Sequence, residues 1–183
     1  MNLRPEPIER PGKSWTLTEN LIKSAFPPDE QEPMTLLTEL AQDPMVNFWA
    51  YYDGEDYCGM CYVVESPRIL FVLYLAVPDE LRSKGYGAAI LDDVRARFGG
   101  KDIVLHVEDP DKNEQKREQR IRRIKFYERN GFSDTGWRID NKDDCFFLIS
   151  TAENFHIDMY MELMYLYSKG EYTPPVYLPE NRG

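Results

Sequence analysis

The sequence contains few cysteines, few histidines and no long hydrophobic segment. Its three cysteines, Cys58, Cys61 and Cys145, are too few and odd in number for a disulfide framework. With only two histidines, no metal site is indicated. No hydrophobic run approaches the roughly 18 residues that span a bilayer, and residues 1–11 lack the hydrophobic core of a secretory signal. We therefore expect a reduced protein of the cytoplasm with no metal.

Basic residues are also in deficit, with 22 Lys and Arg against 32 Asp and Glu and a formal net charge of −10. Nucleic acids and anionic membranes attract an excess of Lys and Arg, so we expect neither as a partner. The charge is uneven, because residues 111–129 carry eight basic and four acidic side chains. A solvated helix face is the simplest explanation of that segment.

What the chain does contain is enough apolar residues to fold. Hydrophobic residues make up 42% of the sequence and aromatic residues 13%, too many for a disordered chain of this charge. A length of 183 residues fits one domain, and no repeat or low-complexity linker divides it. We predict a single domain over residues 1–183.

Hydrophobic patterning predicts the order of helices and strands. Residues 69–77 are nine consecutive apolar residues, typical of a central strand buried on both faces. Residues 46–52 and 57–64 flank an Asp-Gly turn, which is typical of a hairpin. Thr16-Leu17-Thr18-Glu19 has the pattern of a capping box that begins a helix. We also expect an extended segment over 1–13, helices over 16–26, 33–42, 114–129 and 155–167 and one ending near 98, strands over 103–107 and 145–150, and an extended tail over 172–179. This order predicts an α/β fold with a mixed sheet flanked by helices.

The segment Arg82-Ser83-Lys84-Gly85-Tyr86-Gly87-Ala88 joins the central strand to the next helix. Gly85 and Gly87 allow a ligand to approach the backbone closely, and the first N–H groups of a helix have no partner inside it. Together with the helix dipole and the cations Arg82 and Lys84, these groups predict a pyrophosphate site. The spacing matches neither the P-loop nor the Rossmann fingerprint, and simple turn chemistry is the alternative explanation.

Two motifs in this order resemble those of the GNAT N-acetyltransferase superfamily. Residues 82–88 match its acyl-CoA signature, Arg/Gln-x-x-Gly-x-Gly/Ala. Lys125-Phe126-Tyr127-Glu128-Arg129-Asn130-Gly131-Phe132 matches its second motif, a helix with a tyrosine before Asn/Leu-Gly-Phe. Gly59 stands where the family often has the glycine of a Val-Gly pair. The resemblance covers residues 14–150, and the C-terminal helix and tail over 155–183 lie outside it.

This resemblance implies a GNAT-like fold, a central twisted mixed sheet flanked by helices, and an acetyl-CoA-dependent N-acetyltransferase. An amine of a small molecule or protein would attack acetyl-CoA directly, and Tyr127 would be the general acid for the departing thiolate. The pantetheine would lie along the central strand and the diphosphate on the amides that follow it. The implied acetyl-CoA-binding residues are Leu75, Ala76, Val77, Arg82, Ser83, Lys84, Gly85, Tyr86, Gly87 and Ala88.

The central strand lacks the carboxylate that many family members use as the general base. Glu108, at the end of the next predicted strand, is the best candidate, and His106 lies two positions earlier on the same face. A glutamate that bonds its own loop and a half-buried histidine are the alternatives. Arg120 stands where the family often has an asparagine that contacts pantetheine, which puts that contact in doubt.

Three alternatives stay open at this point. A non-catalytic acyl-CoA-binding sensor would use the same glycine-containing turn without transferring an acyl group. In the basic segment, some of Arg117, Arg120, Arg123 or Lys125 would contact the phosphates of CoA rather than solvent. The tail over 172–179 would join two copies of the chain in a homodimer. The acidic remainder of the chain favours a cationic acceptor such as an amine.

Overall fold

The computed structural model of the chain describes residues 1–8, 12–141 and 144–179. It divides into two compact units, one made of Met1–Glu65 and Val72–Lys101 and the other of Ser66–Phe71 and Asp102–Gly183. The division falls inside strand β4 (Ile69–Ala76), which contributes to both units. The single domain expected from the sequence therefore stays a prediction.

Within the described ranges, eight strands form one sheet with the hydrogen-bonded order β1-β2-β3-β4-β5-β7-β6-β8. The strands are β1 (Leu3–Pro7), β2 (Val46–Asp53), β3 (Asp56–Glu65), β4 (Ile69–Ala76), β5 (Asp102–Glu108), β6 (Ser133–Asn141), β7 (Asp144–Ser150) and β8 (Val176–Tyr177). β4 pairs with β5 in parallel, whereas β2 is antiparallel to β1 and β3, and β7 to β5 and β6. The predicted α/β class with a mixed sheet is confirmed.

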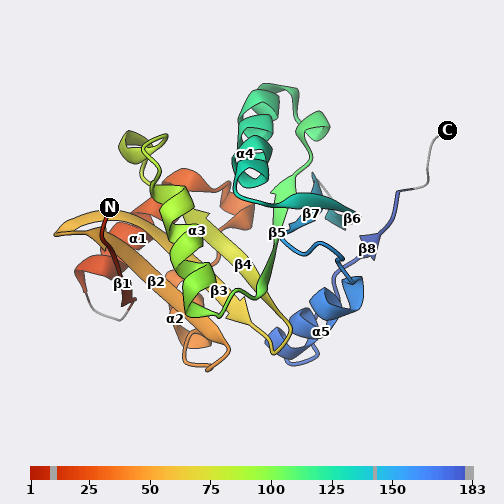
Figure 1. Ribbon diagram of the computed structural model, residues 1–183, viewed down its shortest axis with the longest axis horizontal. Helices are drawn as coiled ribbons and strands as arrows, with labels where there is room; N and C mark the ends of the chain where they lie inside the picture. Colours follow the sequence, from red (N-terminus) through yellow and green to blue (C-terminus); the bar gives the residue numbers. More distant parts are fainter. Residues whose placement is uncertain (9–11, 142–143, 180–183) are drawn as a thin grey trace. The chain divides into compact units, whose positions relative to one another are not determined.

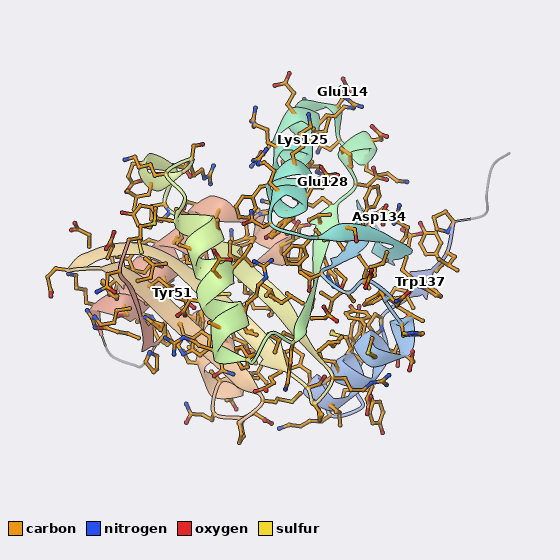
Figure 2. The ribbon with its side chains drawn as sticks, in the orientation of Figure 1. Tyr51, Glu114, Lys125, Glu128, Asp134 and Trp137 are labelled. Atoms are coloured by element: carbon orange, nitrogen blue, oxygen red, sulfur yellow. The ribbon has the colours of Figure 1, made fainter. Side chains whose placement is uncertain are left out.

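In the first unit, helix α3 (Tyr86–Arg97) covers one face of the strands and helix α1 (Lys13–Ala25) the other (Figure 1). Tyr51 of β2 is fully buried and donates a hydrogen bond to Asp93 of α3, 3.0 Å away (Figure 2). On the opposite face, Tyr57 of β3 shares a hydrogen bond of 3.1 Å with Thr18 of α1. Alternation along the strands thus places tyrosines against both helices.

Helix α1 begins earlier than predicted. Its first residue is Lys13, with Gly12 as N-cap, so the predicted capping box at residues 16–19 is wrong. Thr18 is buried against β3, where its hydroxyl bonds Tyr57, and Glu19 pairs with Lys23 at 2.9 Å one turn later. The Thr16 N–H donates a hydrogen bond to the Gly12 carbonyl oxygen at 3.4 Å, so Thr16 lies inside the first turn rather than at the N-cap. The next helix of this unit, α2 (Met34–Leu40), agrees with its predicted range.

The second unit contains β5, β6, β7 and β8 with helices α4 (Arg117–Arg129) and α5 (Ile157–Tyr167). Strand β6 was not predicted, because its sequence has little alternation of apolar and polar residues. Its register is held by antiparallel pairing with β7 and by Arg138, whose guanidinium lies 3.8 Å from the Phe147 ring centre and bonds Asp134 twice. The predicted extended tail includes β8, which pairs with β6.

Two further findings concern the described part of the chain. None of its helices combines the length and the apolarity that crossing a bilayer requires. Nor does it contain a group of three or more His, Cys, Asp or Glu side chains placed to hold a metal ion. Residues 9–11 of the predicted extended segment lie outside the described residues.

Candidate acyl-CoA site

The end of β4 and the start of α3 approach each other closely at Gly59 of β3. A Cβ atom built on Gly59 would lie 2.7 Å from the Ala76 carbonyl oxygen and 2.8 Å from Cδ1 of Ile90. Both separations are too short for a real side chain, so only glycine allows this packing. The glycine that stood out in the sequence is thus a spacer that lets β3, β4 and α3 meet.

The predicted pantetheine-binding residues Leu75, Ala76 and Val77 lie at the carboxyl end of β4. Ala76 is buried, and Leu75 and Val77 are half-buried. One step earlier, the Tyr74 hydroxyl donates a hydrogen bond to the Glu30 carbonyl oxygen at 2.6 Å and accepts one from a second backbone group of the α1–α2 segment at 3.2 Å. β4 therefore anchors that segment through a tyrosine while its carboxyl end leads into the glycine-containing turn.

The turn before α3 has the geometry of an anion site. Gly85 is the N-cap residue of α3 and has φ +90°, a left-handed conformation that favours glycine. Its carbonyl oxygen accepts the first helical hydrogen bond, from the Ala89 N–H at 3.0 Å. Among the described residues no side chain caps this helix, and its first turn carries no acidic residue. The first N–H groups of α3 and the helix dipole therefore favour an anion here.

The seven predicted residues of the turn lie together, and the turn is open to solvent. Arg82, Ser83, Lys84 and Gly85 are exposed, and the next three residues are half-buried. Ser83 has φ +62°, which is uncommon for a residue other than glycine. Arg82 pairs with Asp79 three residues earlier at 2.6 Å, and half of its side chain is exposed. These residues can supply cations and backbone donors to a phosphate group.

Sequence reasoning missed one residue that supports this turn. Asp53 ends β2 and was assigned only to the hairpin turn, but its carboxylate accepts hydrogen bonds from the Tyr86 hydroxyl and the Asn2 backbone N–H, both at 3.2 Å. It therefore ties the first residue of α3 to the amino-terminal segment. The local sequence around Asp53 does not indicate these two hydrogen bonds, because Tyr86 and Asn2 lie 33 and 51 positions away from it in the chain.

Tyr127, the predicted general acid, lies in the second unit and is 7% exposed. Its ring makes edge contacts with Phe126 and Phe132, with centroid separations of 5.0 and 5.3 Å. Its carbonyl oxygen accepts hydrogen bonds from the N–H groups of Asn130 and Phe132, and Gly131 ends the helix with φ +83°. The motif around Tyr127 therefore forms the carboxyl end of α4 and holds the ring in place.

The two candidate bases, Glu108 and His106, have different surroundings. Glu108 ends β5, is 5% exposed and forms an ion pair with Arg123 of α4. The Nε2 atom of His106 lies 2.8 Å from the Tyr160 hydroxyl, and the His106 ring packs on Phe71. Burial lowers the pKa of His106 to about 4, so its imidazole is neutral at pH 7. His106 thus fits the alternative of a buried, hydrogen-bonded histidine.

Three of the four basic residues proposed for the CoA phosphates, Arg117, Arg120 and Arg123, are bonded within the second unit. Arg120 is buried, and its Nη1 donates a hydrogen bond of 2.6 Å to the Asp109 carbonyl oxygen. Arg123 pairs with Glu108. Arg117 pairs with an exposed aspartate at 3.1 Å, and Lys125 of α4 is exposed (Figure 2). The buried side of α4 is therefore used for packing, and its exposed side carries the remaining cations.

A sequence comparison with protein families matches residues 44–134 to the acetyltransferase (GNAT) domain. The matched range includes Gly59, the turn before α3 and Tyr127. A comparison with curated protein sequences found no match.

Solved structures share the fold over nearly the whole chain. A protein from Bacteroides thetaiotaomicron, described as an acetyltransferase of the GNAT family, is 25% identical with a TM-score of 0.70, over 92% of this chain and 99% of that one. The ribosomal-protein-S18-alanine N-acetyltransferase of Escherichia coli is 14% identical with a TM-score of 0.61, over 85% and 99%. An aminoglycoside 6′-N-acetyltransferase solved with coenzyme A is 15% identical with a TM-score of 0.63, over 85% and 100%. The predicted GNAT-like fold is confirmed.

Proposed function

Because the chain belongs to the GNAT acetyltransferase superfamily, we propose that it transfers the acetyl group of acetyl-CoA to a primary amine of a small molecule or protein. The observation that carries the proposal is the start of α3, where Gly85 at φ +90° precedes a helix that no side chain caps within the described residues. A phosphate group accepts hydrogen bonds from such N–H groups and is stabilised by the helix dipole.

The residues that we propose to hold acetyl-CoA form one continuous stretch of the first unit. The main chain of Leu75, Ala76 and Val77 at the end of β4 would bond the pantetheine, as an added strand does. The backbone N–H groups of residues 82–88, with the cations Arg82 and Lys84, would bind the diphosphate. When bound, acetyl-CoA supplies a thioester carbonyl that a neutral amine can attack.

We propose Tyr127 as the general acid. In water, the transfer of a proton from a phenol with a pKa near 10 to a thiolate whose conjugate acid has a pKa of about 8.5 is uphill by about 1.5 pKa units. Desolvation of the bound thiolate lowers this cost, because it raises the basicity of the thiolate. The contacts with Phe126 and Phe132 support the proposal by restricting the ring. Glu108 as the base that accepts the amine proton is a weaker proposal, since its carboxylate already pairs with Arg123.

The test has two stages. First, a thermal shift titration with acetyl-CoA is expected to raise the melting temperature, because a ligand that binds only the folded state stabilises it. Second, release of CoA thiol is measured with spermidine, an aminoglycoside and a peptide that has a free amino-terminal alanine. We expect turnover with at least one amine. Tyr127→Phe should lower kcat at least tenfold and leave the affinity for acetyl-CoA within twofold.

The outcomes separate the proposal from its alternative. No stabilisation by acetyl-CoA would contradict the site itself. Stabilisation without turnover for any amine would favour the non-catalytic acyl-CoA sensor. Wild-type turnover in Tyr127→Phe would remove Tyr127 from the acid role and leave the transferase activity in place.

On composition, we further propose that the protein works in the cytoplasm without metal, nucleic acid or membrane partners. The deficit of Lys and Arg supports this for anionic partners. Light scattering over a concentration series would show whether the chain also forms a homodimer.

A further inference from the structure

The buried side of α4 carries two arginines next to the proposed acid. Arg120, Arg123 and Tyr127 are spaced three and four residues apart, which places them on one side of a helix. Arg120 and Tyr127 are the buried residues of α4, and the Arg123 side chain is 28% exposed. Charged side chains are rarely buried unless they are paired, so the arginines need a specific partner in the unit.

Both arginines find that partner at the carboxyl end of β5. Arg123 forms an ion pair with Glu108, the last residue of β5, and Arg120 donates a hydrogen bond to the carbonyl oxygen of the next residue, Asp109. The Asp109 N–H in turn donates to the Cys145 carbonyl oxygen of β7 at 2.7 Å. Glu108 and Asp109, at the carboxyl end of β5, therefore hold α4 at Arg123 and at Arg120, one turn apart.

The Glu108–Arg123 ion pair has a defined geometry because the Glu108 carboxylate is buried, with 5% of the residue exposed, and water cannot replace its partner. A carboxylate removed from water requires a charged or hydrogen-bonding partner, and the planar guanidinium of arginine satisfies it in few orientations. Tyr127 lies one turn beyond Arg123 on the same rigid helix. Any rotation or sliding of α4 that moved Tyr127 would also break the Glu108–Arg123 pair.

We propose that Glu108 and Arg123 are positioning residues that fix the proposed acid Tyr127, and that Arg120 assists them through Asp109. This inference rests on the proposed function, because positioning matters for the reaction only if Tyr127 donates the proton. It gives Glu108 a role other than the general base expected from the sequence. Lysine at position 123 would keep the charge but lose the fork of donors, so it should restore the function only in part.

The experiment is a double-mutant cycle with Tyr127→Phe, assayed with the amine that the wild-type chain acetylates fastest. Arg123→Ala and Glu108→Gln should each lower kcat at least tenfold, with the KM for acetyl-CoA within twofold, and Arg123→Lys should recover part of the loss. In the Tyr127→Phe background, Arg123→Ala should change kcat less than twofold. Arg122→Ala is the matched control, since the Arg122 side chain on the same helix is 71% exposed, and it should stay within twofold of wild type.

Three results would overturn the inference. Arg123→Ala could lower kcat equally with and without the Tyr127 hydroxyl, which would mean that it does not act through Tyr127. Glu108→Gln could abolish the acidic limb of the pH profile of kcat/KM, which would make Glu108 the base. Tyr127→Phe alone could turn over at the wild-type rate, in which case the acid assignment fails together with the positioning role.

A second measurement decides the inference if no amine is acetylated. The ¹³C signal of the Tyr127 ring, assigned in the full chain by its loss in Tyr127→Phe, should shift in Arg123→Ala and return toward the wild-type position in Arg123→Lys. It should not move in Arg122→Ala. An unchanged Tyr127 signal in Arg123→Ala would show that the pair does not position the ring.

Discussion

Gly59 of β3 lies so close to Ala76 of β4 that a Cβ atom at position 59 would be 2.7 Å from the Ala76 carbonyl oxygen. The backbone of Gly59 is not left-handed, so the requirement for glycine is steric rather than conformational. Because the obstacle is a backbone atom at the end of the proposed pantetheine strand, it cannot move aside as a flexible side chain would.

Gly59→Ala should therefore lower the free energy of unfolding by about 1–3 kcal/mol, the range for overpacking a well-packed site. Denaturant unfolding measures this change. Gly54→Ala is the control, because it adds the same methyl group at a position where nothing lies within 4 Å of the new Cβ atom. Any loss of stability in Gly54→Ala comes from the strain of φ +63° and not from overpacking. A Gly59→Ala variant as stable as wild type would refute the close packing.

Gly85→Asp tests the start of α3. An aspartate carboxylate at this position would place a negative charge beside the N–H groups that we assign to the diphosphate, and like charges repel. We expect at least tenfold weaker acetyl-CoA binding by calorimetry. The matched control is Gly54→Asp, the same change at another glycine with positive φ, which should bind within twofold of wild type. Equal affinities in both variants would place the phosphates elsewhere.

His106 should make the stability depend on pH. Its pKa is about 4 in the folded chain because it is buried, and about 6.5 when unfolded, so below pH 6.5 the unfolded chain binds more protons. The stabilisation of the folded chain relative to the unfolded chain by the neutral His106 is fully present above pH 6.5. It is lost as the pH falls from 6.5 toward 4, because the unfolded chain then gains a proton that the folded chain does not. Between pH 7 and pH 5 it should remove about 2 kcal/mol of unfolding free energy.

The difference between wild type and a His106→Asn variant, measured by denaturant unfolding at both pH values, isolates this effect from the carboxylates. His156, the other histidine, is exposed, and His156→Asn should keep the wild-type pH dependence. If His106→Asn also kept the wild-type pH dependence of the unfolding free energy, then His106 would not be buried as a neutral imidazole.

Tyr74→Phe should loosen the segment between α1 and α2. The variant removes the hydroxyl that bonds the Glu30 carbonyl oxygen and the Glu32 N–H, and a lost hydrogen bond of this kind costs about 1–2 kcal/mol. Hydrogen exchange at the Glu32 amide should become faster. Tyr57→Phe removes a hydroxyl that bonds Thr18 instead, and it should leave the Glu32 exchange rate unchanged.

The elements that the sequence predicted well are those with strong local signals. The apolar run of β4 and the Asp-Gly hairpin appear where expected, because burial on both faces and a turn with φ +63° at Gly54 leave clear patterns. β6 was missed because its pairing with β7 and the bonds of Arg138 hold it, rather than its own alternation. The predicted start of α1 was wrong because the Thr16 N–H already bonds the Gly12 carbonyl oxygen, so Thr16 lies in the first helical turn and does not cap the helix.

By itself, the sequence determined the turn before α3 and the motif around Tyr127, because each consists of consecutive residues whose backbone conformation depends on local glycines. Only the tertiary structure decided that Glu108 pairs with Arg123, that Asp53 holds Tyr86, and that His106 is neutral beside Tyr160. These pairs lie 15 to 54 positions apart. Hydrophobic patterning predicts which side chains are buried, but it does not specify which polar partner each will meet, because that depends on how strands and helices pack.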